Sequence, residues 1–270
     1  MSRYGLIAGN GKFPFLVLDA ARSQGIDMVV AAIKEEAFEE INSAASTVHW
    51  IGLGQLSKLI KTFKEEGVTQ AIMAGQVKHK QIFSSIVPDI KLVKLLANLA
   101  SKNTDSLIGA VAGVLEEEGI RLMESTAFLK PLLPEPGVLT VRSPSETETK
   151  DIEYGRRLAY EIARLDIGQS VAVRDQACIA VEAMEGTDEV IRRAASLVGN
   201  QPFTVVKVSK PKQDMRFDVP VVGLPTVELM AETNATALAI DAGKTLLIDR
   251  EKVVAFANEH QISIAAYEPE

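Results

Sequence analysis

The fold of the first half of the chain follows from one stretch near the N-terminus, Tyr4-Gly5-Leu6-Ile7-Ala8-Gly9-Asn10-Gly11-Lys12-Phe13-Pro14. Its apolar run at 4–8 predicts a strand, and residues 12–23 have the period of a helix. The pattern then repeats, with strands expected at 27–33, 47–51 and 69–74 and helices at 56–66, 92–100 and 104–118. Strands that alternate with helices predict a Rossmann-like parallel sheet with helices on both faces.

Four prolines and a glycine are concentrated in the middle of the chain. Pro131, Pro134, Pro136, Gly137 and Pro144 follow one another closely, a composition typical of a linker. We therefore expect an N-terminal Rossmann-like domain at 1–130, a linker at 131–148 and a C-terminal catalytic domain of mixed α/β type at 149–270. In the last of these the pattern predicts helices at 151–165 and 187–197, a hairpin of strands at 169–174 and 177–182, a strand at 203–208, and mixed elements at 227–232, 235–240, 245–248 and 250–258.

The composition limits the class of protein. The 270 residues carry a net charge of −7, which argues against nucleic-acid binding because that needs a basic face. Cys178 is the only cysteine, so no intramolecular disulfide can form, as is usual in the cytoplasm. The N-terminus has no basic segment followed by an apolar one, and no apolar run approaches the roughly 20 residues that span a bilayer. We expect a cytoplasmic protein without a signal peptide or a transmembrane segment.

Two short loops are candidates for binding a ligand. Gly9-Asn10-Gly11 lies between the first predicted strand and its helix, where parallel sheets bind phosphate groups. Gly75-Gln76 follows the strand at 69–74, so both loops are expected at the same sheet edge and at the same ligand. Pro14 stands where the dinucleotide fingerprint needs a small residue, which disfavours a nicotinamide or flavin cofactor. The alternative is a tight turn that needs glycine for its backbone angles.

The densest group of charges is the stretch Lys207-Val208-Ser209-Lys210-Pro211-Lys212-Gln213-Asp214-Met215-Arg216-Phe217-Asp218-Val219-Pro220. Its lysines and arginine suit phosphate oxygens, and Asp214 and Asp218 suit a hard divalent cation. Phosphate and metal together indicate phosphoryl transfer or pyrophosphate hydrolysis. The alternative is a loop whose opposite charges pair in water.

Glu185-Gly186-Thr187 is a second candidate for binding an anion. It ends one predicted strand and opens a helix, so its backbone N–H groups are available to a phosphate. The alternative is an acidic turn with Thr187 as the helix cap. Cys178 lies inside an apolar strand, and we expect it in the core.

In these motifs the chain resembles the metal-dependent UDP-2,3-diacylglucosamine pyrophosphatases of the LpxI type, over nearly its whole length. The resemblance rests on residues 5–14, 74–77 and 182–188, and most strongly on 210–220 leading into Gly223 and Thr226. Each motif is short. Their order, their spacing and the matching total length make the combination specific.

The resemblance implies a two-domain, dimeric hydrolase of lipid A biosynthesis. Such an enzyme cleaves UDP-2,3-diacylglucosamine to UMP and 2,3-diacylglucosamine 1-phosphate, using magnesium or a similar divalent cation and a water that attacks the phosphorus nearer the sugar. Asp218 is then the essential carboxylate, for metal binding or water activation, Asp214 is the second metal ligand, and Arg216 stabilises phosphate charge. The expected substrate contacts are Gly9, Asn10, Gly11, Gly75, Gln76, Glu185, Gly186, Thr187, Lys210, Lys212 and Gln213.

A substrate that resides in a bilayer implies peripheral contact with the inner membrane. Its two acyl chains need a lining, for which the expected residues are Phe83, Ile86, Val87, Leu92 and Leu95; the alternative is that these are ordinary core or dimer contacts. Two other functions remain open at this point. One is a nucleotide-dependent transferase that needs an acceptor substrate, and the other is a lipid- or nucleotide-binding regulator that leaves its ligand unchanged.

Overall fold

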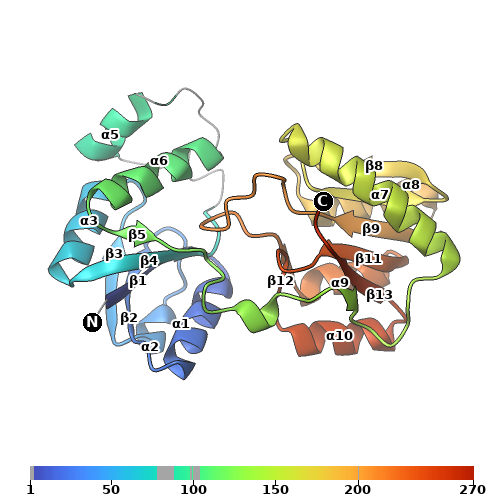
Figure 1. Cartoon of the computed structure of the whole chain (residues 1–270), viewed down its shortest axis with the longest axis horizontal. Coiled ribbons are helices and arrows are strands. Elements are labelled where there is room, and N and C mark those ends of the chain that lie inside the picture. The colour runs from blue at the N-terminus through green and yellow to red at the C-terminus, as the bar shows by residue number, and fades with distance from the viewer. Residues whose placement is uncertain (1–2, 78–87, 98, 100–103, 200) are drawn as a thin grey trace. The chain divides into compact units, whose positions relative to one another are not determined.

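The chain forms two compact units, shown as a computed structural model in Figure 1. The structure describes residues 3–77, 88–97, 99, 104–199 and 201–270. Unit 1 comprises Met1–Leu129 together with Asp214–Asp218, and unit 2 comprises Lys130–Gln213 together with Val219–Glu270. The five residues at the centre of the charged run therefore pack with the first unit, although the strand before them belongs to the second. The predicted division into domains at 1–130 and 149–270 with a linker at 131–148 stays a prediction.

Unit 1 is built on a parallel sheet, as predicted. Within the described residues its strands are β1 (Arg3–Ala8), β2 (Met28–Ile33), β3 (Thr47–Ile51), β4 (Val68–Ala74) and β5 (Arg121–Leu122), in the order β3-β2-β1-β4-β5. Every residue of β2 is buried, and this is why the strand reads as one continuous apolar run. The helices α1 (Phe13–Ser23), α2 (Ile41–Ala44), α3 (Leu56–Glu65), α5 (Ile90–Ala97) and α6 (Thr104–Glu117) lie on both sides of the sheet (Figure 1).

Unit 2 contains a mixed sheet with the order β6-β13-β11-β9-β7-β8. Its strands are β6 (Gly137–Val138), β7 (Ser170–Arg174), β8 (Ala177–Val181), β9 (Phe203–Lys207), β11 (Ala235–Asp241) and β13 (Ser263–Tyr267). The central strands β9, β11 and β13 run parallel, whereas β7 and β8 form the predicted antiparallel hairpin. Unit 2 also contains a short separate pair of strands, β10 (Val221–Val222) and β12 (Leu246–Leu247), and one turn of 3-10 helix, η1 (Lys130–Leu132).

Helices cover both faces of this second sheet. One face packs against α7 (Glu146–Arg164), and the other packs against α8 (Thr187–Val198), α9 (Leu224–Glu232) and α10 (Arg250–Glu259). Alternating residues of one strand serve the two faces: Val171 and Val173 contact the α7 side, and Ala172 contacts the other. The predicted fold, two units of α/β type with a Rossmann-like parallel sheet first, is confirmed.

Three local predictions were wrong. Helix α7 starts at Glu146 and not at residue 151, because Ser145 and Glu148 form a capping box in which each side chain accepts a hydrogen bond from the other's backbone N–H. Gly186, with φ of +87°, precedes the first residue of α8, so Thr187 is inside the helix and is not its cap. Cys178 is exposed and not in the core, because it lies in β8, which is at the edge of the sheet and pairs with a neighbour on one side only.

Candidate functional site

The centre of the charged run is a single helical turn. The backbone N–H groups of Phe217 and Asp218 donate to the Asp214 carbonyl at 3.1 and 2.9 Å. Met215 is buried, with 7% of its surface exposed, and Phe217 packs against the core of unit 1. Asp214, Arg216 and Asp218 alternate with these two residues and are half-buried. The turn therefore keeps its apolar side chains in unit 1 while its charged side chains retain contact with solvent.

Arg216 and Asp214 form a two-point ion pair within this turn. The guanidinium of Arg216 donates from Nε to Oδ1 at 2.9 Å and from Nη2 to Oδ2 at 2.7 Å. These hydrogen bonds lower the pKa of Asp214 and raise that of Arg216, so both stay charged. The guanidinium also lies over the Phe217 ring, 5.9 Å from its centroid. Both carboxylate oxygens of Asp214 are thus occupied by Arg216.

Ser125, which was not among the residues predicted from the sequence, holds this turn. Its backbone N–H donates to the Met215 carbonyl at 2.8 Å. Its hydroxyl lies 2.7 Å from the Arg216 carbonyl oxygen and 2.5 Å from that of Met73, in β4. The turn is therefore attached near the carboxyl end of β4. Ser125 belongs to no motif, and 91 positions separate it from Arg216, so no local signal in the sequence identifies it.

The two glycine loops contact each other at the carboxyl ends of β1 and β4. Asn10 and Gln76 exchange backbone hydrogen bonds, N–H to carbonyl, at 2.8 and 3.0 Å. A Cβ atom on Gly75 would lie 2.6 Å from the Asn10 carbonyl oxygen, and one on Gly9 would lie 2.7 Å from that of Gln76. Gly11 has φ of +94° with open space around it. The close approach of the two backbones accounts for Gly9 and Gly75, and ligand binding by these loops stays a prediction.

Thr187 of the second anion candidate takes part in a hydrogen-bond network in unit 2. Its Oγ1 accepts a hydrogen bond from Lys207 Nζ at 3.0 Å and donates to Glu182 Oε1 at 3.2 Å. Lys207 and Glu182 are both buried. Glu185 forms an ion pair of 2.8 Å with Arg193. The side chains around Gly186 thus have protein partners, and a role in substrate binding for Glu185, Gly186 and Thr187 stays a prediction.

The remaining predicted substrate contacts begin the charged run in unit 2. Lys210 Nζ lies 2.8 Å from Asp166 Oδ1. Gln213 Oε1 accepts from the backbone N–H of Lys210 at 2.6 Å, and the Gln213 N–H donates back to the Lys210 carbonyl at 2.9 Å. Lys212 is exposed. These three residues form a compact turn of their own.

A buried aspartate anchors the chain where it leaves β9. The N–H and the hydroxyl of Ser209 both donate to Asp241 Oδ2 at 2.7 Å, and the Tyr160 hydroxyl donates to Oδ1 at 2.7 Å. Asp241 is fully buried at the end of β11. Burial, together with the hydrogen bond to Asp241, raises the pKa of Tyr160 to about 12, so the phenol stays a donor. The charged run therefore starts from a fixed point in unit 2.

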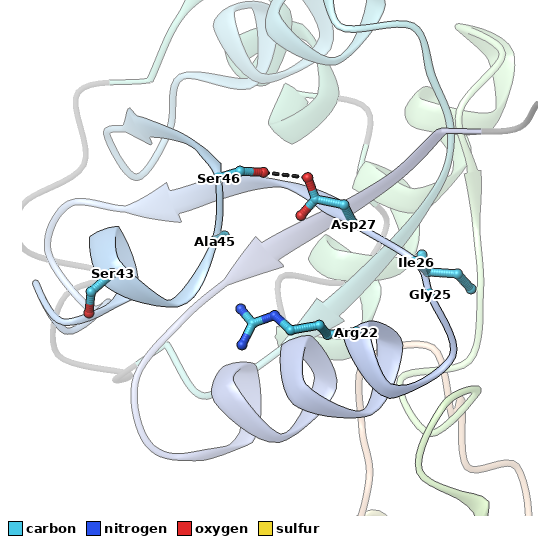
Figure 2. A pocket seen from close by; sticks show the side chains of 7 residues that line it. All are labelled: Arg22, Gly25, Ile26, Asp27, Ser43, Ala45 and Ser46. Atoms are coloured by element: carbon cyan, nitrogen blue, oxygen red, sulfur yellow. Dashed lines mark hydrogen bonds between the residues drawn. The ribbon is translucent and has the colours of Figure 1, made fainter.

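A shallow recess on unit 1 lies at the opposite edge of its sheet. Figure 2 shows its lining, which consists of Arg22, Gly25, Ile26, Asp27, Ser43, Ala45 and Ser46. These residues precede β2 and β3, so the recess is at the amino ends of the strands, whereas the glycine loops follow carboxyl ends. Ligands of parallel α/β sheets bind outside the carboxyl ends. The recess is therefore not the candidate site.

The structure also bears on the predicted lining for acyl chains. Leu92 is buried in the core of unit 1, and Leu95 is partly buried against it. Phe83, Ile86 and Val87 lie outside the described residues.

Among the residues that are described, no three histidine, cysteine or acidic side chains are grouped as a metal centre, and no helix is long and apolar enough to cross a bilayer.

Related sequences identify the family. The sequence profile of the LpxI N-terminal domain matches residues 3–132, and that of the LpxI C-terminal domain matches residues 135–265. The chain belongs to the LpxI family. One LpxI protein, the UDP-2,3-diacylglucosamine pyrophosphatase LpxI of Caulobacter vibrioides, is 30% identical over 280 aligned positions, which cover 100% of this chain and 99% of that protein. The resemblance inferred from the short motifs is confirmed.

Solved structures add little to the LpxI assignment. The biotin carboxylase domain of the 2-oxoglutarate carboxylase from Hydrogenobacter thermophilus is 18% identical with a TM-score of 0.28, and the match covers 66% of this chain and 36% of that one. Phosphoribosylglycinamide synthetase from Anaerococcus prevotii is 12% identical with a TM-score of 0.28, covering 71% and 35%. The chain thus spans about a third of each protein, and likenesses this weak carry no argument about LpxI function.

Proposed function

We propose that this protein hydrolyses the pyrophosphate bond of UDP-2,3-diacylglucosamine to give UMP and 2,3-diacylglucosamine 1-phosphate, a step of lipid A biosynthesis. The observation that carries the proposal is the match to LpxI along the entire chain, including a relative named for this activity. The chemistry of the turn at Asp214–Asp218 supports it. A guanidinium suits the charge of a pyrophosphate, and a carboxylate suits the activation of water.

The turn also fits a divalent cation such as Mg²⁺. Magnesium takes one or two protein carboxylates and completes its coordination with water and substrate phosphate, so a preformed cluster of three acidic side chains is unnecessary. Asp218 is the carboxylate we assign to it. Asp214 can join when Arg216 turns from it toward the substrate, because Arg216 occupies both of its oxygens here. A bound cation would offset phosphate charge and lower the pKa of a coordinated water.

The residues of the chain then have distinct tasks. Arg216 neutralises the charge that develops on the pyrophosphate. Until substrate binds, Asp214 orients the guanidinium, and a substrate phosphate then takes the place of the Asp214 carboxylate. Asp218 accepts the proton of the attacking water as its oxygen bonds to the phosphorus nearer the sugar. The bond from that phosphorus to the bridging oxygen breaks, and UMP leaves with the electron pair. The glycine loops and the Lys210–Gln213 turn supply further contacts to substrate.

Contact with the membrane and formation of a homodimer are also proposals. A diacylated substrate resides in a membrane, so we expect peripheral contact of the protein with the inner membrane on its cytoplasmic side. We also expect a homodimer, as the family resemblance implies. Sedimentation of the purified protein with and without lipid vesicles measures the membrane contact, and its sedimentation velocity measures the dimer.

The decisive experiment incubates the purified protein with dispersed UDP-2,3-diacylglucosamine in Mg²⁺ or in EDTA and measures UMP by chromatography. We expect release of UMP in Mg²⁺ and none in EDTA. Asp218→Ala should abolish release while its circular dichroism stays that of the wild type. Asp19→Ala, an exposed aspartate of the same unit, is the matched control and should retain full activity.

The possible outcomes separate the competing functions. Near-normal activity of Asp218→Ala would contradict the role of that residue. Ligand that binds but stays intact would indicate a lipid- or nucleotide-binding regulator, and turnover only when an acceptor is added would indicate a transferase.

A further inference from the structure

Ser125 joins the proposed catalytic turn to the sheet of unit 1 through hydrogen bonds to two separate backbone segments. It is buried, with 1% of its surface exposed, and follows β5. We infer that Ser125 is a positioning residue, which holds the turn at Asp214–Asp218 in register with the carboxyl end of β4. The kinetic consequence of this inference rests on the function proposed above.

The hydrogen bonds inside the turn fix its shape but not its position relative to the sheet. The N–H groups of Phe217 and Asp218 both donate to Asp214, within the same five residues. Apart from the packing of Met215 and Phe217, Ser125 attaches the turn: its N–H donates to the Met215 carbonyl and its hydroxyl to the Arg216 carbonyl. Two successive peptide groups of the turn are thus held by one residue, which restricts both translation and rotation of the turn.

The second contact of the hydroxyl extends this restraint to the sheet edge that carries the glycine loops. Ser125 Oγ lies 2.5 Å from the carbonyl of Met73, and β4 passes from there directly into the loop at Gly75 and Gln76. A hydroxyl has a single proton, so it serves the Met73 and Arg216 carbonyls by sharing or by alternating between them. Without it, two carbonyl groups in a buried region lose their common donor. The turn would then be free to shift relative to the glycine loops.

Such a shift affects turnover more than substrate binding. Arg216 and Asp218 act at the reacting phosphorus, and a displacement of about 1 Å at a reacting centre costs on the order of 100-fold in rate. The other substrate contacts that we propose, at the glycine loops and at Lys210–Gln213, lie outside the turn, so we expect loss of the Ser125 hydroxyl to leave them in place. The expected signature is therefore a fall in kcat with little change in KM.

The kinetic test compares Ser125→Ala with Ser125→Thr and with a control. In Ser125→Ala we expect kcat to fall by roughly 10- to 100-fold and KM to change less than about threefold. Ser125→Thr, which restores the hydroxyl, should recover most of the lost kcat. Thr62→Ala removes another buried hydroxyl of unit 1, in α3, and should keep kcat within about twofold of the wild type. A Ser125→Ala enzyme as active as this control would overturn the inference.

A second measurement is independent of catalysis. Hydrogen exchange of a peptide covering residues 213–219 reports the N–H groups of Phe217 and Asp218. Exchange should be faster in Ser125→Ala than in the wild type and unchanged in Thr62→Ala; unchanged exchange in both would overturn the inference. If Ser125→Ala does not fold, Ser125→Cys keeps the volume but weakens the donor, and it gives the same comparison. A wild type that releases no UMP would refute the proposed function, while the exchange result would still decide the role of Ser125.

Discussion

Replacing Glu148 by glutamine removes the carboxylate that ties the start of α7 to β11. Glu148 accepts hydrogen bonds from Arg142 Nη1 and Nη2 at 2.7 and 2.9 Å, from the Ser145 N–H at 2.7 Å and from the Thr236 hydroxyl at 2.7 Å. Burial by itself would raise the pKa of Glu148. The hydrogen bonds outweigh burial and lower the pKa from 4.5 to about 2.

The lowered pKa gives the expected loss of stability. A carboxyl group whose pKa is about 2.5 lower in the folded than in the unfolded state stabilises the protein by about 3 kcal/mol at neutral pH. Because the folded pKa is the lower one, this stabilisation is complete above about pH 5 and disappears as the pH falls toward 2. We therefore expect Glu148→Gln to reduce the free energy of unfolding by about 3 kcal/mol at pH 7 and by roughly half of that at pH 3.

Urea unfolding at pH 7 and pH 3, followed by far-ultraviolet circular dichroism, measures both values. The matched control is Glu146→Gln, which removes the same charge from the first turn of α7 at a side chain that is 84% exposed and pairs with Lys150. An exposed pair of this kind contributes less than about 0.5 kcal/mol. A loss of stability in Glu148→Gln no larger than that in Glu146→Gln at pH 7, or a loss equal at both pH values, would contradict this prediction.

Two further substitutions test the candidate site. Arg216→Lys should lower kcat/KM for UMP release by roughly tenfold or more while the Tm stays within about 2 °C, because an ammonium cannot match both oxygens of Asp214 or of a phosphate; activity equal to the wild type would contradict this. Gly75→Ala should reduce the stability of unit 1, measured by calorimetry, by about 2–4 kcal/mol, because φ is +93° and its Cβ would meet the Asn10 carbonyl at 2.6 Å. Gly67→Ala has φ of +69° but open space, and its cost should be about 1 kcal/mol; equal costs would show that the close approach is unimportant.

The regular elements were largely predictable because their signals are local. The buried strands β1 and β2 read as continuous apolar runs, and the strand–glycine–helix order near the N-terminus predicted a parallel sheet. The start of α7 was also present in the sequence as the Ser145-x-x-Glu148 capping box, but it lay in the stretch read as a linker. Strand β13 was missed because its residues, Ser263–Tyr267, include two alanines, which give little strand signal.

The amino-acid sequence alone was sufficient to identify the family, the charged run, and the alternation of charged and apolar residues from Asp214 to Asp218. These depend on residue type and short spacing, which the chain displays directly. The packing of this turn with unit 1, the ion pair of Arg216 with Asp214, and the attachment of the turn to β4 by Ser125 could be seen only in the folded chain. The reason is physical. A buried hydrogen bond between residues 91 positions apart exists only because folding brings two distant segments to the same sheet edge, and neither segment carries a local sign of the other.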